Sequence, residues 1–127
     1  MILPGNEAHT LPIINYDEIG GSVHIKGKSI SPEVEEYYGE FLPYFKDCLS
    51  KAPQDLKVTM ELEYFNTKSS RILITFFGII KDEVVERGFN PDITWILEEG
   101  DEDMREAVED YEDLTKLKMK IEEVPEE

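Results

Sequence analysis

Three hydroxyl side chains stand close together where a strand pattern gives way to a helix pattern. The segment reads Tyr64-Phe65-Asn66-Thr67-Lys68-Ser69-Ser70-Arg71. One interpretation is a helix N-cap, because Ser, Thr and Asn side chains accept hydrogen bonds from free backbone N–H groups. The other is a phosphorylation site, because the N–H donors and positive dipole end of a helix stabilise a phosphate. Lys68 and Arg71 add positive charge there in an otherwise acidic chain.

Phosphorylation of such a hydroxyl would change the surface strongly. It adds about −1.5 to −2 charges and three acceptor oxygens. On an exposed loop, that change is enough to abolish docking onto a partner. The segment therefore predicts a binding switch that needs no catalytic residue in the chain.

A run of carboxylates at residues 98–113 is the second feature that could do chemistry. It holds Glu98, Glu99, Asp101, Glu102, Asp103, Glu106, Glu109, Asp110, Glu112 and Asp113, against a single base, Arg105. A calcium loop starting at Asp101 would match at three positions, but it would place Arg105 and Glu106 where a ligand and a turn glycine are needed. The run fits better as the solvated face of an amphipathic helix, with a docking surface for a basic partner or a divalent-metal site as alternatives.

The residues for nucleophilic catalysis are sparse. His9 lies in the first segment, His24 is expected on an exposed strand face, and Cys48 falls on the apolar stripe of a helix. Such catalysis needs a base beside the nucleophile. The sequence also contains no phosphate-binding loop and no dinucleotide fingerprint. We therefore predict no catalytic residue and no cofactor.

Alternating and helical apolar patterns predict the elements that position these residues. Residues 1–10 are expected to form a flexible lead-in or a short edge segment. Predicted strands cover 11–16, 22–28, 56–65, 92–97 and 117–124; predicted helices begin at Ser31, run from about 70 to 87, and run from 101 to about 114. The strands at 56–65 and 117–124 are apolar on one face only. The sequence thus predicts a two-layer α/β fold, with a mixed sheet of about five strands and helices mainly on one face.

Composition bounds the class of protein. The chain has 127 residues, which fits a single domain over 1–127, and 29 acidic against 13 basic residues give a net charge of −16. So acidic a surface argues against binding nucleic acid or anionic membranes. Cys48 is the only cysteine, which excludes an internal disulfide. We expect a cytoplasmic protein, since the first ten residues lack a secretory-signal pattern.

Four features occur together along the chain: the helix start Ser31-Pro32-Glu33, the strand leading into Asn66-Thr67, Trp95, and the acidic run Glu109-Asp110-Tyr111-Glu112-Asp113-Leu114. This pattern resembles the SiaC-like regulatory phosphoproteins of bacteria, which are related in fold to the SpoIIAA-type anti-sigma-factor antagonists (STAS-like domains).

The resemblance implies a phosphorylation switch at Thr67. A partner kinase adds the phosphate and a phosphatase removes it, and the unmodified protein binds a diguanylate cyclase, which tunes cyclic-di-GMP and biofilm behaviour. An anti-sigma-factor antagonist is the alternative within the related families. Asn66, Lys68, Ser69 and Ser70 are expected to form the partner-binding surface around Thr67. Ser69 and Ser70 remain alternative acceptors.

Overall fold

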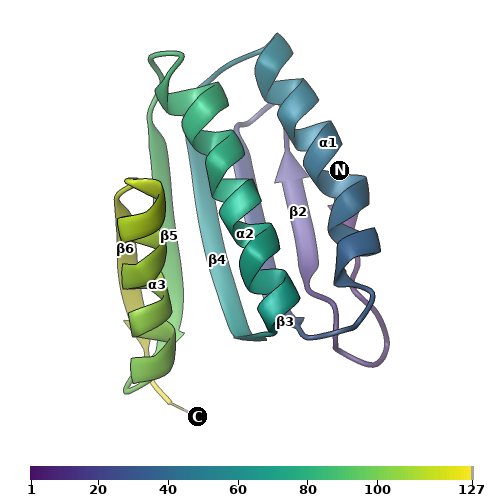
Figure 1. Ribbon diagram of the computed structural model, residues 1–127, viewed down its shortest axis with the longest axis vertical. Helices are drawn as coiled ribbons and strands as arrows, with labels where there is room; N and C mark the ends of the chain where they lie inside the picture. Colours follow the sequence, from purple (N-terminus) through teal and green to yellow (C-terminus); the bar gives the residue numbers. More distant parts are fainter. Residues whose placement is uncertain (127) are drawn as a thin grey trace.

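The strand with the clearest alternation, β4 (Leu56–Phe65), lies inside a single mixed sheet (Figure 1). The computed structural model describes residues 1–126. The strand order is β1-β2-β3-β4-β5-β6; β1–β2 and β2–β3 pair antiparallel and the remaining pairs are parallel. The other strands are β1 (Ile2–Leu3), β2 (Ile13–Asp17), β3 (Ser22–Ser29), β5 (Pro91–Glu98) and β6 (Met119–Val124).

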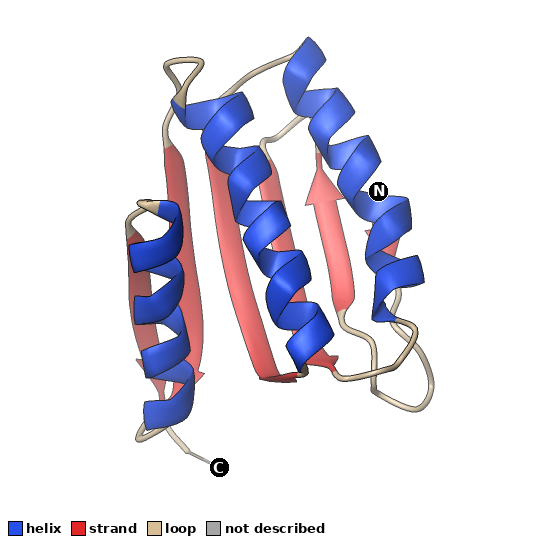
Figure 2. Ribbon diagram, viewed as in Figure 1, coloured by secondary structure: helices blue, strands red, loops and turns tan. Residues whose placement is uncertain are grey.

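Three helices cover one face of this sheet. They are α1 (Val34–Lys51), α2 (Thr67–Ile80) and α3 (Glu102–Thr115), and α2 continues into a π-helical turn, η1 (Lys81–Val85). Figure 2 shows all three helices on the same side of the strands. On β4, Val58 is buried toward the helices, whereas its neighbour Lys57 is exposed. The predicted two-layer α/β architecture is confirmed.

The sheet has six strands rather than about five. The additional strand, β1, comes from the predicted lead-in, and its Ile2 pairs with Asn15 of β2. The amino group of Met1 also donates to the carbonyl of Tyr16 at 2.8 Å. The prediction of a short edge segment is therefore correct for Ile2 and Leu3. A two-residue strand carries too little alternation to be recognised from sequence.

Aromatic rings fill the space between the two layers. One group joins α1 to α2, with Phe45 and Phe76 stacked at 5.2 Å between ring centroids. A second group joins α2, β5 and α3. In it, Trp95 stacks on Tyr111 at 5.8 Å with an angle of 12° between the rings, and Phe77 lies 6.0 Å from Trp95. The second group fixes α3 and α2 over the same strand.

In the described part of the chain, one buried side-chain polar atom within this core has no hydrogen-bond partner. The hydroxyl of Tyr16, on β2, makes no hydrogen bond among the described residues, although the side chain is buried. Burial raises the pKa of this phenol. An unpaired buried hydroxyl costs free energy of desolvation without a compensating bond.

Tyr16→Phe is therefore expected to raise the free energy of unfolding by about 1 kcal/mol. Tyr38→Phe is the matched control, because the Tyr38 hydroxyl lies 3.1 Å from the Ser29 hydroxyl and is bonded to it. That control should lower the free energy of unfolding by about 1 kcal/mol. Urea unfolding followed by circular dichroism measures both. A loss of stability in Tyr16→Phe equal to that in Tyr38→Phe would mean that the Tyr16 hydroxyl does have a hydrogen-bond partner.

The tip of the β2–β3 hairpin is tied to α1 by Glu18. The carboxylate of Glu18 accepts hydrogen bonds from the Tyr44 hydroxyl and from the Cys48 thiol, the latter at 3.1 Å. These bonds lower the pKa of Glu18, and burial is the main cause of a raised pKa at Cys48. Cys48, which was predicted on the apolar stripe of a helix, is half-buried and hydrogen-bonded. Nothing in the sequence places Glu18 beside α1.

This contact predicts a pH-dependent contribution to stability. A carboxyl group with a lowered native pKa stabilises the fold above its ordinary value of 4.5, and the contribution is lost as the pH falls through the native pKa. Glu18→Gln should therefore be less stable than the wild type at pH 7, and the difference should close below pH 4.5. Urea titrations across this range test it, with the exposed Glu122→Gln as control. A difference that does not vary with pH would contradict the role of the carboxylate.

Candidate functional site

The predicted switch segment forms the junction between β4 and α2. Asn66 is the N-cap of α2: its side-chain oxygen accepts from the Ser69 N–H at 2.8 Å, and its side-chain amide donates to the Ser31 carbonyl at 3.3 Å. The Asn66 N–H donates to the carbonyl of Ser29 at 3.0 Å. The N-cap interpretation is therefore correct. It places Thr67 at the first helical position.

The helix begins three residues earlier than predicted. The helix was expected to begin at about residue 70, but α2 starts at Thr67. Asn66 explains the difference, since an N-cap side chain satisfies a donor of the first turn and sets where the helix begins. Thr67 and Lys68 therefore lie on the first turn of a capped helix, and both are exposed.

Ser69 lies in the interior, which contradicts the expectation that it belongs to the surface around Thr67. The side chain is fully buried. Its hydroxyl donates to the Ser29 carbonyl at 2.7 Å and lies 2.7 Å from the Ser29 hydroxyl. The Ser29 hydroxyl in turn contacts that of Tyr38 on α1. This network of buried hydroxyls joins the end of β3, the start of α2, and α1.

Ser70 is half-buried and is engaged with α3. The Tyr111 hydroxyl lies 3.1 Å from both the carbonyl and the hydroxyl of Ser70. Burial is the main cause of the raised pKa of Tyr111. Of the three hydroxyls predicted as acceptors, Thr67 is thus the exposed one.

The start of α2 differs in charge from the starts of the other helices. The first turns of α1 and α3 each carry two acidic residues, whereas the first turn of α2 carries none. Lys68 and Arg71 are exposed there instead. Because the helix dipole also places positive charge at its N-terminus, this junction is a locally positive site on a chain with a net charge of −16.

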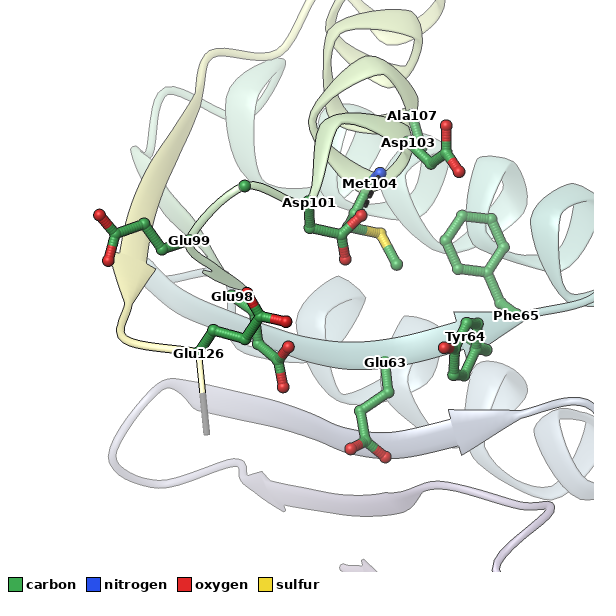
Figure 3. A pocket seen from close by; sticks show the side chains of 11 residues that line it. Glu63, Tyr64, Phe65, Glu98, Glu99, Asp101, Asp103, Met104, Ala107 and Glu126 are labelled. Carbon is green, nitrogen blue, oxygen red and sulfur yellow. Dashed lines mark hydrogen bonds between the residues drawn. The ribbon is translucent and has the colours of Figure 1, made fainter.

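A groove opens beside the junction, where β4 and β5 separate. Their pairing ends at Met60 and Trp95, although β4 continues to Phe65 and β5 to Glu98. The hollow between these strand ends and the start of α3 has a volume of about 480 Å³ (Figure 3). We call it the acidic groove, because six carboxylates line it: Glu63, Glu98, Glu99, Asp101, Asp103 and Glu126. Sequence analysis predicted the acidic run but not the groove.

The acidic run itself is helical and partly committed to structure. It forms most of α3, as the amphipathic-helix interpretation predicted. Asp101 caps α3 by accepting from the Met104 N–H at 3.1 Å, and Glu112 accepts from the Met119 N–H at 3.0 Å. Within residues 1–126, no group of three or more His, Cys, Asp or Glu side chains is placed to hold a metal ion. This finding gives no support to the alternative of a metal site.

The two histidines lie away from this junction. His24 is on β3, with its Nε2 3.1 Å from a carboxylate oxygen of Glu61, and it lines a hollow on the sheet beside Thr59 and Lys57. His9 lies in the loop before β2. Cys48 contacts Glu18, as described above. None of these side chains contributes to the β4–α2 site.

The structural comparisons find the same fold in one group of solved proteins. A structure described as apo-SiaC from Pseudomonas aeruginosa has a TM-score of 0.83 and 18% identity, covering 96% of this chain and 97% of that chain. A second structure of SiaC from Pseudomonas aeruginosa has a TM-score of 0.85 and 18% identity, with 98% of each chain covered. The crystal structure of the diguanylate cyclase SiaD in complex with its activator SiaC, also from Pseudomonas aeruginosa, matches with a TM-score of 0.88, 18% identity and coverage of 98% and 99%.

One of the two sequence comparisons identifies a family. Among curated protein sequences, none matches this chain significantly. Within the described residues, no helix combines the length and apolarity that crossing a membrane requires. The family model described as SiaC family regulatory phosphoprotein matches residues 6–124. This match spans nearly the whole chain, and it includes both the N-cap Asn66 and the exposed Thr67. The chain therefore belongs to the SiaC family of regulatory phosphoproteins.

Proposed function

We propose that residues 1–127 form a single, non-enzymatic, cytoplasmic regulatory domain that binds a partner protein while Thr67 is unmodified and releases it when Thr67 is phosphorylated. The proposed partner is a diguanylate cyclase, by analogy with the solved complex of a SiaC protein with the cyclase SiaD. A kinase adds the phosphate and a phosphatase removes it, so the switch acts on cyclic-di-GMP signalling and biofilm formation.

The exposure of Thr67 is the observation that carries this proposal. A kinase must reach the hydroxyl that it modifies, and Ser69 is fully buried while Ser70 is half-buried and bonded to Tyr111. The exposed side chains of Thr67 and Lys68 supply the central contact surface. Asn66 and Ser70 border it, and Ser69 supports it from below.

A phosphate on Thr67 would lie at the positive start of α2. Asn66 already satisfies the Ser69 N–H, so the N–H groups of Thr67 and Lys68 remain as donors of the first turn. A phosphate can accept from such donors and pair with Lys68 or Arg71. It would thereby occupy the groups that an unmodified helix start offers to a partner.

The test is to phosphorylate the folded protein with the kinase of its own host and to locate the phosphate by peptide mass spectrometry. We expect the modification on Thr67, little on Ser70 and none on Ser69. Calorimetric titrations of both forms against the diguanylate cyclase of the same host should then show at least about tenfold weaker binding for the phosphorylated form. Equal affinity of the two forms, or a phosphate found only on a serine, would refute the switch at Thr67.

A further inference from the structure

The acidic groove has an apolar floor, in which Phe65 and Ala107 are half-buried and Met104 is buried. Phe65, Met104 and Ala107 line it, and Tyr64 at its rim is 65% exposed. Figure 3 shows the side chain of Met104, from α3, next to that of Phe65, from the end of β4. An exposed aromatic ring beside an apolar hollow is typical of a contact surface for another molecule.

The charged side chains that line this hollow are acidic. Among the described residues, six carboxylates line the hollow and no Lys, Arg or His side chain does. In Figure 3 the carboxylates of Glu98 and Glu126 lie on the side nearest β6, and that of Asp103 lies near Phe65. A second hollow shares Glu63 and Glu98 and includes one base, Lys26, whose ammonium lies 3.8 Å from a Glu61 carboxylate oxygen. The surface therefore complements a cation, not an anion.

The rim already shows how a cation can be held. The ammonium of Lys28, on β3, lies 6.0 Å from the centre of the Tyr64 ring. This is within the range of a cation–π contact. A basic side chain of a partner could use the remaining exposed surface of the same ring, with its charge toward Glu63.

The groove also adjoins the proposed switch. Phe65 ends β4, and Asn66 and Thr67 follow it directly. Tyr111 packs near Phe65, at 6.2 Å between ring centroids, and its hydroxyl binds Ser70. A partner bound in the groove would therefore also reach the start of α2.

We propose that the acidic groove receives a cationic, amphipathic segment of the partner protein, with an apolar side chain on the floor and Lys or Arg side chains against the surrounding carboxylates. This inference rests on the proposed function in taking the partner to be a protein. The phosphate on Thr67 acts beside the groove rather than in it: it occupies the N–H donors and the positive charge at the start of α2, which an acceptor group of the partner next to the cationic segment would otherwise contact.

The first experiment compares two triple variants in binding to the host diguanylate cyclase. Glu63→Gln/Glu98→Gln/Asp103→Asn neutralises the groove; these residues make no side-chain hydrogen bond among the described residues, so the fold should persist. We expect about tenfold weaker binding and a weaker dependence on salt.

The matched control changes the same number of charges outside the groove. Glu106→Gln/Glu109→Gln/Asp110→Asn changes exposed positions of α3, the helix that also carries Asp103. We expect the control to bind within about twofold of wild type. Equal weakening in both triples would mean attraction by net charge alone and would overturn the inference. Wild-type affinity in the groove triple would overturn it too, while leaving the switch at Thr67 intact.

A second experiment does not depend on the cyclase. A synthetic helical peptide of leucine and lysine is titrated into the labelled protein, and its position is mapped by NMR. Shifts centred on Phe65, Met104 and Ala107 that weaken in the groove triple support the inference, and a leucine–glutamate peptide should produce none. Shifts spread along the outer face of α3 would overturn it. If the cyclase does not bind the wild type, the proposed function fails. The peptide mapping alone then decides whether the groove binds a cationic, amphipathic segment.

Discussion

Thr67→Asp is expected to weaken binding to the partner cyclase by about tenfold or more, whereas Thr67→Ala and Thr67→Ser should bind within about twofold of wild type. The reason lies in the first turn of α2, which carries no acidic residue and exposes Lys68 and Arg71. A carboxylate at the first helical position accepts from the free N–H donors and neutralises this positive site. Calorimetric titration against the cyclase measures the effect.

A measurement of stability shows whether Thr67→Asp loses affinity because it binds less well or because it unfolds. An acidic residue in the first turn of a helix is favourable by about 0.3–1 kcal/mol, so Thr67→Asp should bind less well and yet unfold at slightly higher urea. Thr75→Asp is the matched control, since Thr75 is exposed on the same helix two turns later. It should leave binding unchanged. Weak binding in both aspartate variants, or equal affinity of Thr67→Asp and Thr67→Ala, would contradict the switch.

The sequence predicted the architecture because the relevant signals are local. The alternation along 56–65 identifies β4 and its buried face, and the one-sided strands imply helices on one face. The start of α2 also had a local signal that was missed. Asn66 is a preferred N-cap residue, and a helix starting at Thr67 places Ser69 four residues before Leu73, on the same buried stripe. Applying that spacing would have predicted that Ser69 is buried.

Other features depend on contacts between distant segments. Ser69 meets Ser29 across 40 residues, and Tyr111 meets Ser70 across 41. These contacts follow from the register of β3 on β4 and from the docking of α3, which a single sequence does not specify. The acidic groove has the same origin. It exists because β4 leaves β5 after Met60 while β5 stays paired with β6 as far as Glu98. The sequence shows the carboxylates but not the separation of the strands.

Trp95→Ala is expected to produce the largest loss of stability of any change considered. Trp95 is fully buried on β5, with Phe77 of α2 and Tyr111 of α3 packed against it. Its Nε1–H also donates to the Met119 sulfur at 3.3 Å. Replacing a buried Trp by Ala typically costs about 3–5 kcal/mol, against a total stability of about 5–15 kcal/mol for a natural domain.

Two further variants calibrate that value. Trp95→Phe keeps an aromatic ring and should cost about 1–2 kcal/mol, and Phe89→Ala, at an exposed position, should cost less than about 1 kcal/mol. Trp95 is the only tryptophan of the chain, so its replacement removes the tryptophan fluorescence signal. Urea unfolding must therefore be followed by circular dichroism. A cost below 1 kcal/mol for Trp95→Ala would mean that the ring does not hold the layers together.

Trp95→Ala should also loosen the start of α2, where Thr67 lies. The ring of Tyr111 stacks on Trp95 and its hydroxyl binds Ser70, one turn from Thr67. Removing the indole frees Tyr111 to move, so the start of α2 should lose support before the rest of the helix does. Hydrogen exchange in Trp95→Ala should therefore quicken at the Ser69 amide, which the Asn66 cap holds, more than at amides in the middle of α2. Uniform acceleration along α2 would show instead that Trp95 stabilises the helix as a whole and not the start that carries Thr67.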